Sequence, residues 1–85
     1  MYKEEVIRQH SPGTIREAYE SIKDSDKWKR VSFIDSYDQG YVFDIKGGKG
    51  LEDFLEANGG FRAVFPPHQD WAEDTVRIDC EMLVA

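Results

Sequence analysis

Apolar residues recur along this chain with two different periods, and each period predicts a different kind of element. The first run has spacings of three and four positions, at Ile15, Ala18, Tyr19 and Ile22. This spacing places the four side chains on one face of an α-helix. The helix start is signalled twice, by Ser11 with Pro12 at the first helical position, or by Thr14. A second, shorter helix is expected from the similar spacing of Leu51, Phe54 and Leu55.

Alternation of apolar and polar residues predicts strands elsewhere. The strands expected in this way cover residues 2–9, 31–33, 41–45, 61–65 and 76–84. The second and third form a hairpin around residues 36–40, where Gly40 suits a positive φ. Asn58-Gly59-Gly60 ends the second helix, with glycine in the left-handed conformation. The last strand has the clearest buried face, formed by Val76, Ile78, Cys80, Met82 and Val84.

The predicted order is β-α-β-β-α-β-β within a single domain, residues 1–85. Its first six elements match the split β-α-β pattern of ferredoxin-like folds. We therefore expect an α+β domain with an antiparallel sheet and two helices packed on one face. The alternative is a related α+β roll in which residues 61–84 form a separate terminal hairpin.

Composition indicates a globular protein that needs no covalent or metal support. The 85 residues are 40% hydrophobic and include 11 aromatics. Cys80 is the only cysteine, so an intramolecular disulfide is impossible, which fits a reducing compartment. No apolar run approaches the roughly 18 residues of a membrane helix, and the charged start lacks a signal peptide's apolar stretch. The expected location is the cytoplasm.

The net charge of −6 lies entirely in the second part of the chain. Residues 1–35 carry seven basic and seven acidic side chains, whereas residues 36–85 carry four basic and ten acidic ones, which sum to −6. DNA, RNA and anionic membranes are therefore not expected to bind directly, because they require basic contacts. A protein with a basic surface is the expected partner. The alternative is that the acidic side chains only keep the domain soluble.

No motif in the sequence predicts catalysis, a metal site or a cofactor. Residues 47–50, Gly-Gly-Lys-Gly, precede a helix as phosphate-binding loops do, but Gly50-Leu51 follows the lysine where a Walker motif has serine or threonine. Glu52 and Asp53 in the next turn would repel a phosphate. His10 and His68 are the only histidines, and they lack the ligand spacing of a zinc site.

The connection between the last two strands, residues 65–74, is longer than a hairpin requires. Long connections of this kind often carry function. It holds Trp71 among acidic residues, an arrangement typical of a binding hot spot, although the indole could instead cover the core. The partner-binding residues predicted here and on the second helix are Asp70, Trp71, Glu73, Asp74, Glu52, Asp53 and Glu56. Trp28, within a short basic cluster, is expected to fix the end of the first helix to the sheet, although the cluster could instead bind nucleic acid by stacking and phosphate contact.

The sequence by itself does not identify a function. The interpretation it favours is a non-enzymatic protein-binding module, such as an inhibitor or immunity-type protein that docks its acidic face on a basic surface. Some small acidic proteins from phages and mobile elements imitate nucleic acid in this way, and the basic surface here could itself be a nucleic-acid site. The alternative is a small-ligand-binding or dimeric regulatory domain of ferredoxin-like type.

Overall fold

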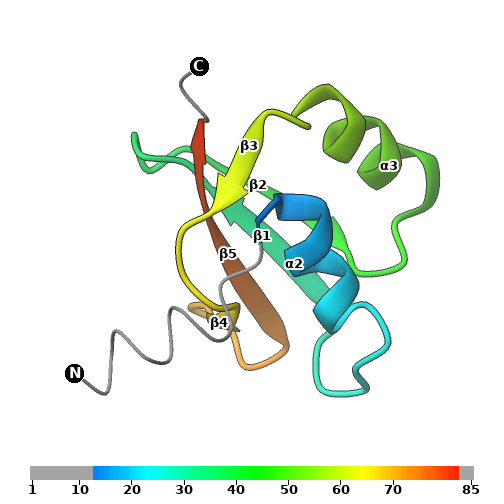
Figure 1. Ribbon diagram of the computed structural model, residues 1–85. Helices are drawn as coiled ribbons and strands as arrows, with labels where there is room; N and C mark the ends of the chain where they lie inside the picture. The colour runs from blue at the N-terminus through cyan, green and yellow to red at the C-terminus, as the bar shows by residue number, and fades with distance from the viewer. Residues whose placement is uncertain (1–12, 83–85) are drawn as a thin grey trace.

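A computed structural model describes residues 13–82 and contains, within that range, two helices and five strands (Figure 1). In chain order the elements are α2 (Ile15–Ile22), β1 (Arg30–Ile34), β2 (Gly40–Asp44), α3 (Gly48–Ala57), β3 (Phe61–Ala63), β4 (His68–Gln69) and β5 (Thr75–Met82). The strand predicted over residues 2–9 lies outside the described residues. The remaining predicted elements are present, and the structure adds the two-residue strand β4.

The five strands form one mixed sheet in the order β2-β1-β5-β3, with β4 paired to the first half of β5. β1 pairs with β2 in an antiparallel hairpin and with β5 in parallel, where Phe33 lies opposite Ile78. This parallel pair corrects the predicted antiparallel sheet. Alternation of apolar and polar residues shows which face of a strand is buried. It does not show whether the neighbouring strand runs parallel or antiparallel to it. β1 is buried on both faces at Val31, Ser32 and Phe33, and it has a paired strand at each edge, β2 and β5.

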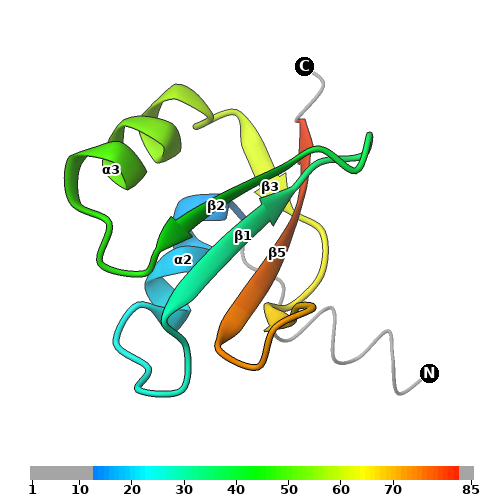
Figure 2. The same cartoon turned by 180° about the vertical axis from the view of Figure 1, so that it is seen from behind.

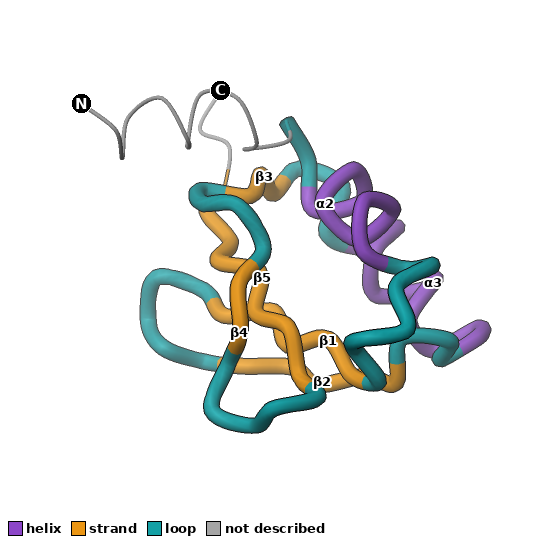
Figure 3. The backbone as a smooth tube through the Cα atoms, turned by 90° about the horizontal axis from the view of Figure 1, so that it is seen from below, coloured by secondary structure: helices purple, strands orange, loops and turns teal. Residues whose placement is uncertain are grey.

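Both helices cover the same face of the sheet, as predicted (Figure 3). α2 packs against β3 and β5, and α3 packs against β2. The predicted helix faces are confirmed, because Ile15, Ala18, Ile22, Leu51 and Leu55 are all buried. They meet the inward residues of β1 and β5 in a single apolar core. Neither helix has the length or the apolar character needed to cross a lipid bilayer.

The helix ends are held by local hydrogen bonds. Thr14, one of the two predicted caps, accepts a hydrogen bond from the backbone N–H of Glu17 at 3.1 Å. Ser11, the other predicted cap, lies outside the described residues. α3 ends at Asn58, whose side-chain amide donates to the carbonyl of Phe54 at 2.9 Å. The prediction of a left-handed glycine at this end is wrong, because Gly48 is the only described glycine with a positive φ. Asn58 satisfies the terminal carbonyl instead.

The hairpin turn also differs from the prediction. Asp38 has a φ of 61°, whereas Gly40 has no positive φ. Aspartate tolerates the left-handed region because its short polar side chain can bond locally. A Cβ at Gly40 would lie 2.7 Å from Cδ1 of Ile34, so a larger residue there would require the end of the Ile34 side chain to move.

The predicted buried face of β5 is confirmed at Val76, Ile78 and Cys80 but is wrong at Met82, which is 62% exposed. β1 accompanies β5 only as far as Asp79, so the end of β5 has a neighbour on one side and little cover. Val84 lies outside the described residues. Phe65 was expected to continue β3, but this strand ends at Ala63 and Phe65 is 39% exposed.

Candidate functional site

The turn between β4 and β5, residues 70–74, presents Trp71 to solvent. We call this segment the Trp71 loop. The indole is 79% exposed, so it does not cover the core. The turn itself is closed by two backbone hydrogen bonds, from Asp70 N to Thr75 O at 2.9 Å and from Thr75 N to Ala72 O at 3.2 Å. A large aromatic side chain is therefore held in water by a well-bonded turn.

Two acidic residues attach the Trp71 loop to the sheet. The hydroxyl of Ser32 donates to Asp70 Oδ2 at 2.6 Å. The backbone N–H of Arg30 donates to the Asp74 carbonyl at 3.1 Å, and its guanidinium lies 3.3 Å from Asp74 Oδ2. The hydrogen bond from Arg30 lowers the pKa of Asp74. Glu73 is exposed and makes no ion pair with the described residues, so it is the free carboxylate beside Trp71.

The three predicted residues of α3 lie elsewhere. Glu52 pairs with Arg16 at 3.1 Å, Asp53 pairs with Lys49 at 3.1 Å, and Glu56 is exposed. In all three overall views α3 and the β4 region lie on different sides of the molecule, with the sheet between them (Figures 1 to 3). The structure therefore does not bring the seven predicted partner-binding residues onto one surface.

A groove of about 330 Å³ lies on the outer face of the sheet, which we define as the face turned away from α2 and α3. The turn between β1 and β2 and the connection between β3 and β4 border the same side of β5 (Figure 2). The floor of the groove includes the apolar side chains of Ile34, Val64 and Phe65. Its charged lining residues are Asp35, Asp38, Asp79, Glu81 and Arg77.

Part of the acidic charge in the groove is balanced by neighbouring bases. The guanidinium of Arg77 lies 2.8 Å from Asp79 Oδ1, and Nε2 of His68 lies 3.5 Å from Asp79 Oδ2. Glu81 pairs with Arg62 at 2.9 Å. The Arg62–Glu81 pair is about half exposed, so it contributes little to stability, whereas the carboxylate of Asp79 is only 17% exposed.

The other two carboxylates belong to the β1–β2 turn. Asp35 Oδ1 accepts hydrogen bonds from the backbone N–H groups of Tyr37 at 2.8 Å and Gln39 at 3.0 Å. Asp38 follows in the left-handed conformation and makes no ion pair with the described residues. Tyr37 is 83% exposed at the tip of this bonded turn. Two turns of the sheet, the β1–β2 turn and the Trp71 loop, thus each carry an exposed aromatic residue.

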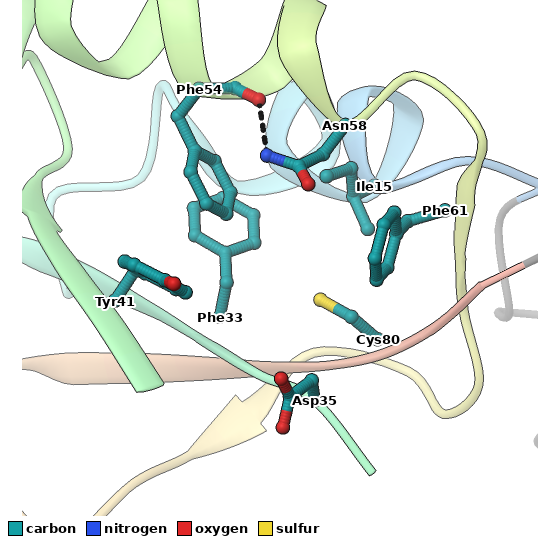
Figure 4. Close-up of a pocket in the computed structure, with 8 residues that line it drawn as sticks. All are labelled: Ile15, Phe33, Asp35, Tyr41, Phe54, Asn58, Phe61 and Cys80. Atoms are coloured by element: carbon teal, nitrogen blue, oxygen red, sulfur yellow. Dashed lines mark hydrogen bonds between the residues drawn. The ribbon is translucent and has the colours of Figure 1, made fainter. Parts of the chain in front are cut away.

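A second, smaller pocket of about 100 Å³ lies on the helix side of the sheet, below the end of α3 (Figure 4). Ile15, Phe33 and Phe61 give it an apolar lining. Figure 4 shows the amide of Asn58 turned to the Phe54 carbonyl rather than left free. The volume is below the roughly 300–1,000 Å³ of ordinary small-molecule sites.

Cys80 borders this pocket but is chemically unreactive. Burial raises the pKa of its thiol to about 12, and the nearby charge of Asp79 acts in the same direction. The thiol also donates to the Ile78 carbonyl at 3.4 Å. Since the thiolate is the nucleophile and the metal ligand, a thiol that stays protonated serves neither role. Among residues 13–82, no three His, Cys, Asp or Glu side chains are placed to hold a metal ion.

The remaining features of interest have structural roles. Trp28 is partly buried against the core, with the Lys27 ammonium 4.5 Å from its ring centre, so it fixes the chain between α2 and β1 as expected. Lys49 of the glycine-rich segment lies within α3 and pairs with Asp53, rather than standing free before the helix. His68 contacts Asp79 and the Pro66 carbonyl.

The groove was missed by sequence reasoning because its walls come from separate parts of the chain. Asp35 and Asp38 lie in one turn, whereas Asp79 and Glu81 lie about forty residues later on β5. The only signal in the sequence was the polar alternation of β5, which marked Arg77, Asp79 and Glu81 as outward-facing. No protein-family model, no curated protein and no solved structure matches this chain.

Proposed function

We propose that this protein is a non-enzymatic protein-binding module that inserts Trp71 into an apolar pocket of a partner with a basic surface. The observation that carries the proposal is the 79% exposure of Trp71 on a turn fixed by hydrogen bonds. Tryptophan is enriched in binding hot spots because it buries a large area with few rotatable bonds.

Preorganisation of the Trp71 loop supports this role. Association costs free energy when it orders flexible segments, and a loop that is already bonded avoids much of that cost. Asp70 and Asp74, two of the predicted contact residues, act here by holding the loop to Ser32 and Arg30. We therefore assign direct contact to Trp71 and Glu73 and a positioning role to Asp70 and Asp74.

Charge supports a basic partner. The chain carries a net charge of −6, and four of its carboxylates lie in the groove on the outer face together with one arginine. Lysine or arginine side chains of a partner could lie over this groove while the partner receives Trp71. This arrangement favours the outer face over α3 as the docking surface, so Glu52, Asp53 and Glu56 are left outside it.

We further propose that the protein acts in the cytoplasm as an inhibitor or immunity-type protein. A compact acidic surface can occupy a basic nucleic-acid site by presenting carboxylates where phosphates would lie. Three further points are also proposals: the chain has a ferredoxin-like topology, it originates in a phage or mobile element, and it forms a homodimer. Small-ligand binding in the apolar pocket is less well supported, because this pocket measures about 100 Å³ and its amide is already bonded to the chain. The larger groove is lined in large part by charged side chains, which suits a basic partner better than an apolar ligand.

The proposal is tested by comparing the two tryptophans. The tagged protein is used to capture partners from a lysate of its native cell, and each candidate is identified, purified and titrated. Trp71→Ala should weaken binding about thirtyfold or more while leaving the melting temperature nearly unchanged. Trp28→Ala should lower the melting temperature by several degrees and keep the affinity of the folded protein.

A second matched pair of variants reverses the charge of one glutamate inside the proposed docking surface and of one outside it. Glu73→Lys should weaken binding to the same purified partner, whereas Glu56→Lys on α3 should have a much smaller effect. If Trp71→Ala binds every purified candidate as tightly as the original protein, Trp71 is not an anchor and the proposal fails.

A further inference from the structure

Asn58 and Gly59 at the end of α3 form the dipeptide most prone to deamidation. In this reaction a solvent base removes the proton of the Gly59 amide, and the nitrogen attacks Cγ of Asn58. A C–N bond forms, the Cγ–Nδ2 bond breaks, and ammonia leaves. Water then opens the resulting succinimide at either carbonyl, which yields aspartate or isoaspartate. Glycine favours the reaction because it lacks a side chain that would hinder closure of the ring.

The fold opposes the first two steps of this reaction, removal of the amide proton and closure of the ring. The Gly59 N–H donates to the Glu56 carbonyl at 3.3 Å, which protects the proton from base. The Asn58 amide donates to the Phe54 carbonyl at 2.9 Å, and this bond fixes the side chain against the end of α3 (Figure 4). The backbone of Asn58, with φ −112° and ψ 31°, places its Cβ and the Gly59 nitrogen nearly opposite each other about the Cα–C bond. Ring closure requires them on the same side.

We propose that Asn58-Gly59 is a deamidation site that the native fold keeps closed, so that modification occurs when the end of α3 opens. The product cannot return to the native arrangement. An aspartate lacks the side-chain N–H that bonds the Phe54 carbonyl and leaves it only the backbone N–H of residue 58, which donates at 3.0 Å. The negative charge of the aspartate also lies at the negative end of the helix dipole. Isoaspartate also lengthens the backbone next to the hydrogen bond from Phe61 N to Asn58 O, which is 3.0 Å long. Deamidation therefore converts a transient opening into a permanent loss of stability.

The test requires only the purified chain. Samples are kept at mildly alkaline pH, folded in buffer or unfolded in denaturant, and peptide mass spectrometry locates the replacement of NH2 by OH. We expect deamidation at Asn58 in the unfolded chain and a rate at least about tenfold lower in the folded chain, as local opening free energies allow. Hydrogen exchange at the Gly59 amide should be slowed by a similar factor, because both reactions need the same proton exposed.

Two variants separate the chemistry from the fold. Gly59→Ala should slow the reaction in the unfolded chain while preserving the fold, since Gly59 has no positive φ and a Cβ there would lie 3.5 Å from the Glu56 carbonyl. Asn58→Asp, which imitates one product, should lower the melting temperature. Equal rates in the folded and unfolded chains would refute protection by the fold. An unfolded chain that keeps Asn58 intact would refute the site itself.

Discussion

Ile78 and Arg77 are neighbours on β5 with opposite environments. Ile78 is fully buried between the sheet and the helices, whereas the Arg77 side chain is 34% exposed on the outer face. Ile78→Ala should lower the free energy of unfolding by about 2–5 kcal/mol, because it leaves a cavity in the core. Arg77→Ala should lower it far less, since it removes one partly exposed ion pair. Denaturant unfolding of both variants measures the difference, and equal losses would show that the strand register is wrong.

The thiol of Cys80 makes stability depend on alkaline pH. Its pKa is raised from an ordinary 9.0 to about 12 by burial, so above pH 9 the unfolded chain loses this proton while the folded chain retains it. The stabilisation is complete below pH 9 and is lost progressively as the pH rises from 9 towards 12. The free energy of unfolding should therefore fall over this range.

The control for this prediction is Cys80→Ala, which should show a shallower decline between pH 9 and 11. Tyr19 also has a raised pKa, from burial and from the charge of Glu52, and it acts in the same direction. It is present in both proteins, so the difference between their slopes isolates the cysteine. Identical slopes would show that Cys80 ionises as readily in the folded chain as in the unfolded one.

At the scale of an element, the Trp71 loop should loosen in acid. Its contact with β1 includes Asp74, whose pKa lies below its ordinary 3.8 because Arg30 donates a hydrogen bond to the carboxylate. Because the pKa of Asp74 is lowered, the stabilisation that its contact with Arg30 gives to the loop is complete above pH 3.8. This stabilisation is lost as the pH falls through the lowered pKa. In a Trp28→Phe protein, where Trp71 is the only tryptophan, fluorescence anisotropy should fall as Asp74 becomes protonated.

Arg30→Ala supplies the comparison for the acid experiment. Without the guanidinium, the Trp71 loop should already be more mobile at neutral pH, and acid should change its anisotropy less. Far-ultraviolet circular dichroism on the same samples shows whether the whole domain remains folded. If the Trp71 loop is equally rigid in both proteins at every pH, the contact between Asp74 and Arg30 does not order it. Its order would then come from backbone hydrogen bonds alone.

At the scale of the whole molecule, the net charge of −6 should accelerate binding to a basic partner. Raising the salt concentration from about 50 to 500 mM shortens the reach of this field, so the association rate should fall markedly. The dissociation rate should change less, because it reflects the buried contacts of Trp71. Stopped-flow measurements with the purified partner separate the two rates. An association rate that is insensitive to salt would remove charge from the proposed recognition.

The periodic patterns of the sequence were sufficient to locate the helices and most of the apolar side chains that form the core. Ile15, Ala18 and Ile22 are buried because a helix brings every third and fourth residue to one face, and this holds in any fold that covers that face. The burial of Val76 and Ile78 follows in the same way from alternation along a strand. Alternation also predicted a buried Met82, which is exposed. Whether the end of a strand is covered depends on which neighbouring strand extends that far, and β1 extends only to Asp79.

The candidate site depended much more on tertiary structure. The sequence marked Trp71 as notable because of its long connection and acidic neighbours, but its exposure was decided by the hydrogen bonds that hold the turn away from the core. The groove on the outer face exists because β5 pairs in parallel with β1 and so lies beside the β1–β2 turn. Local patterns determine which face of an element is apolar, whereas strand order and direction depend on contacts between distant residues. For this protein, the sequence alone determined the elements and much of the core, and the pairing of β1 with β5 decided which charges share a surface.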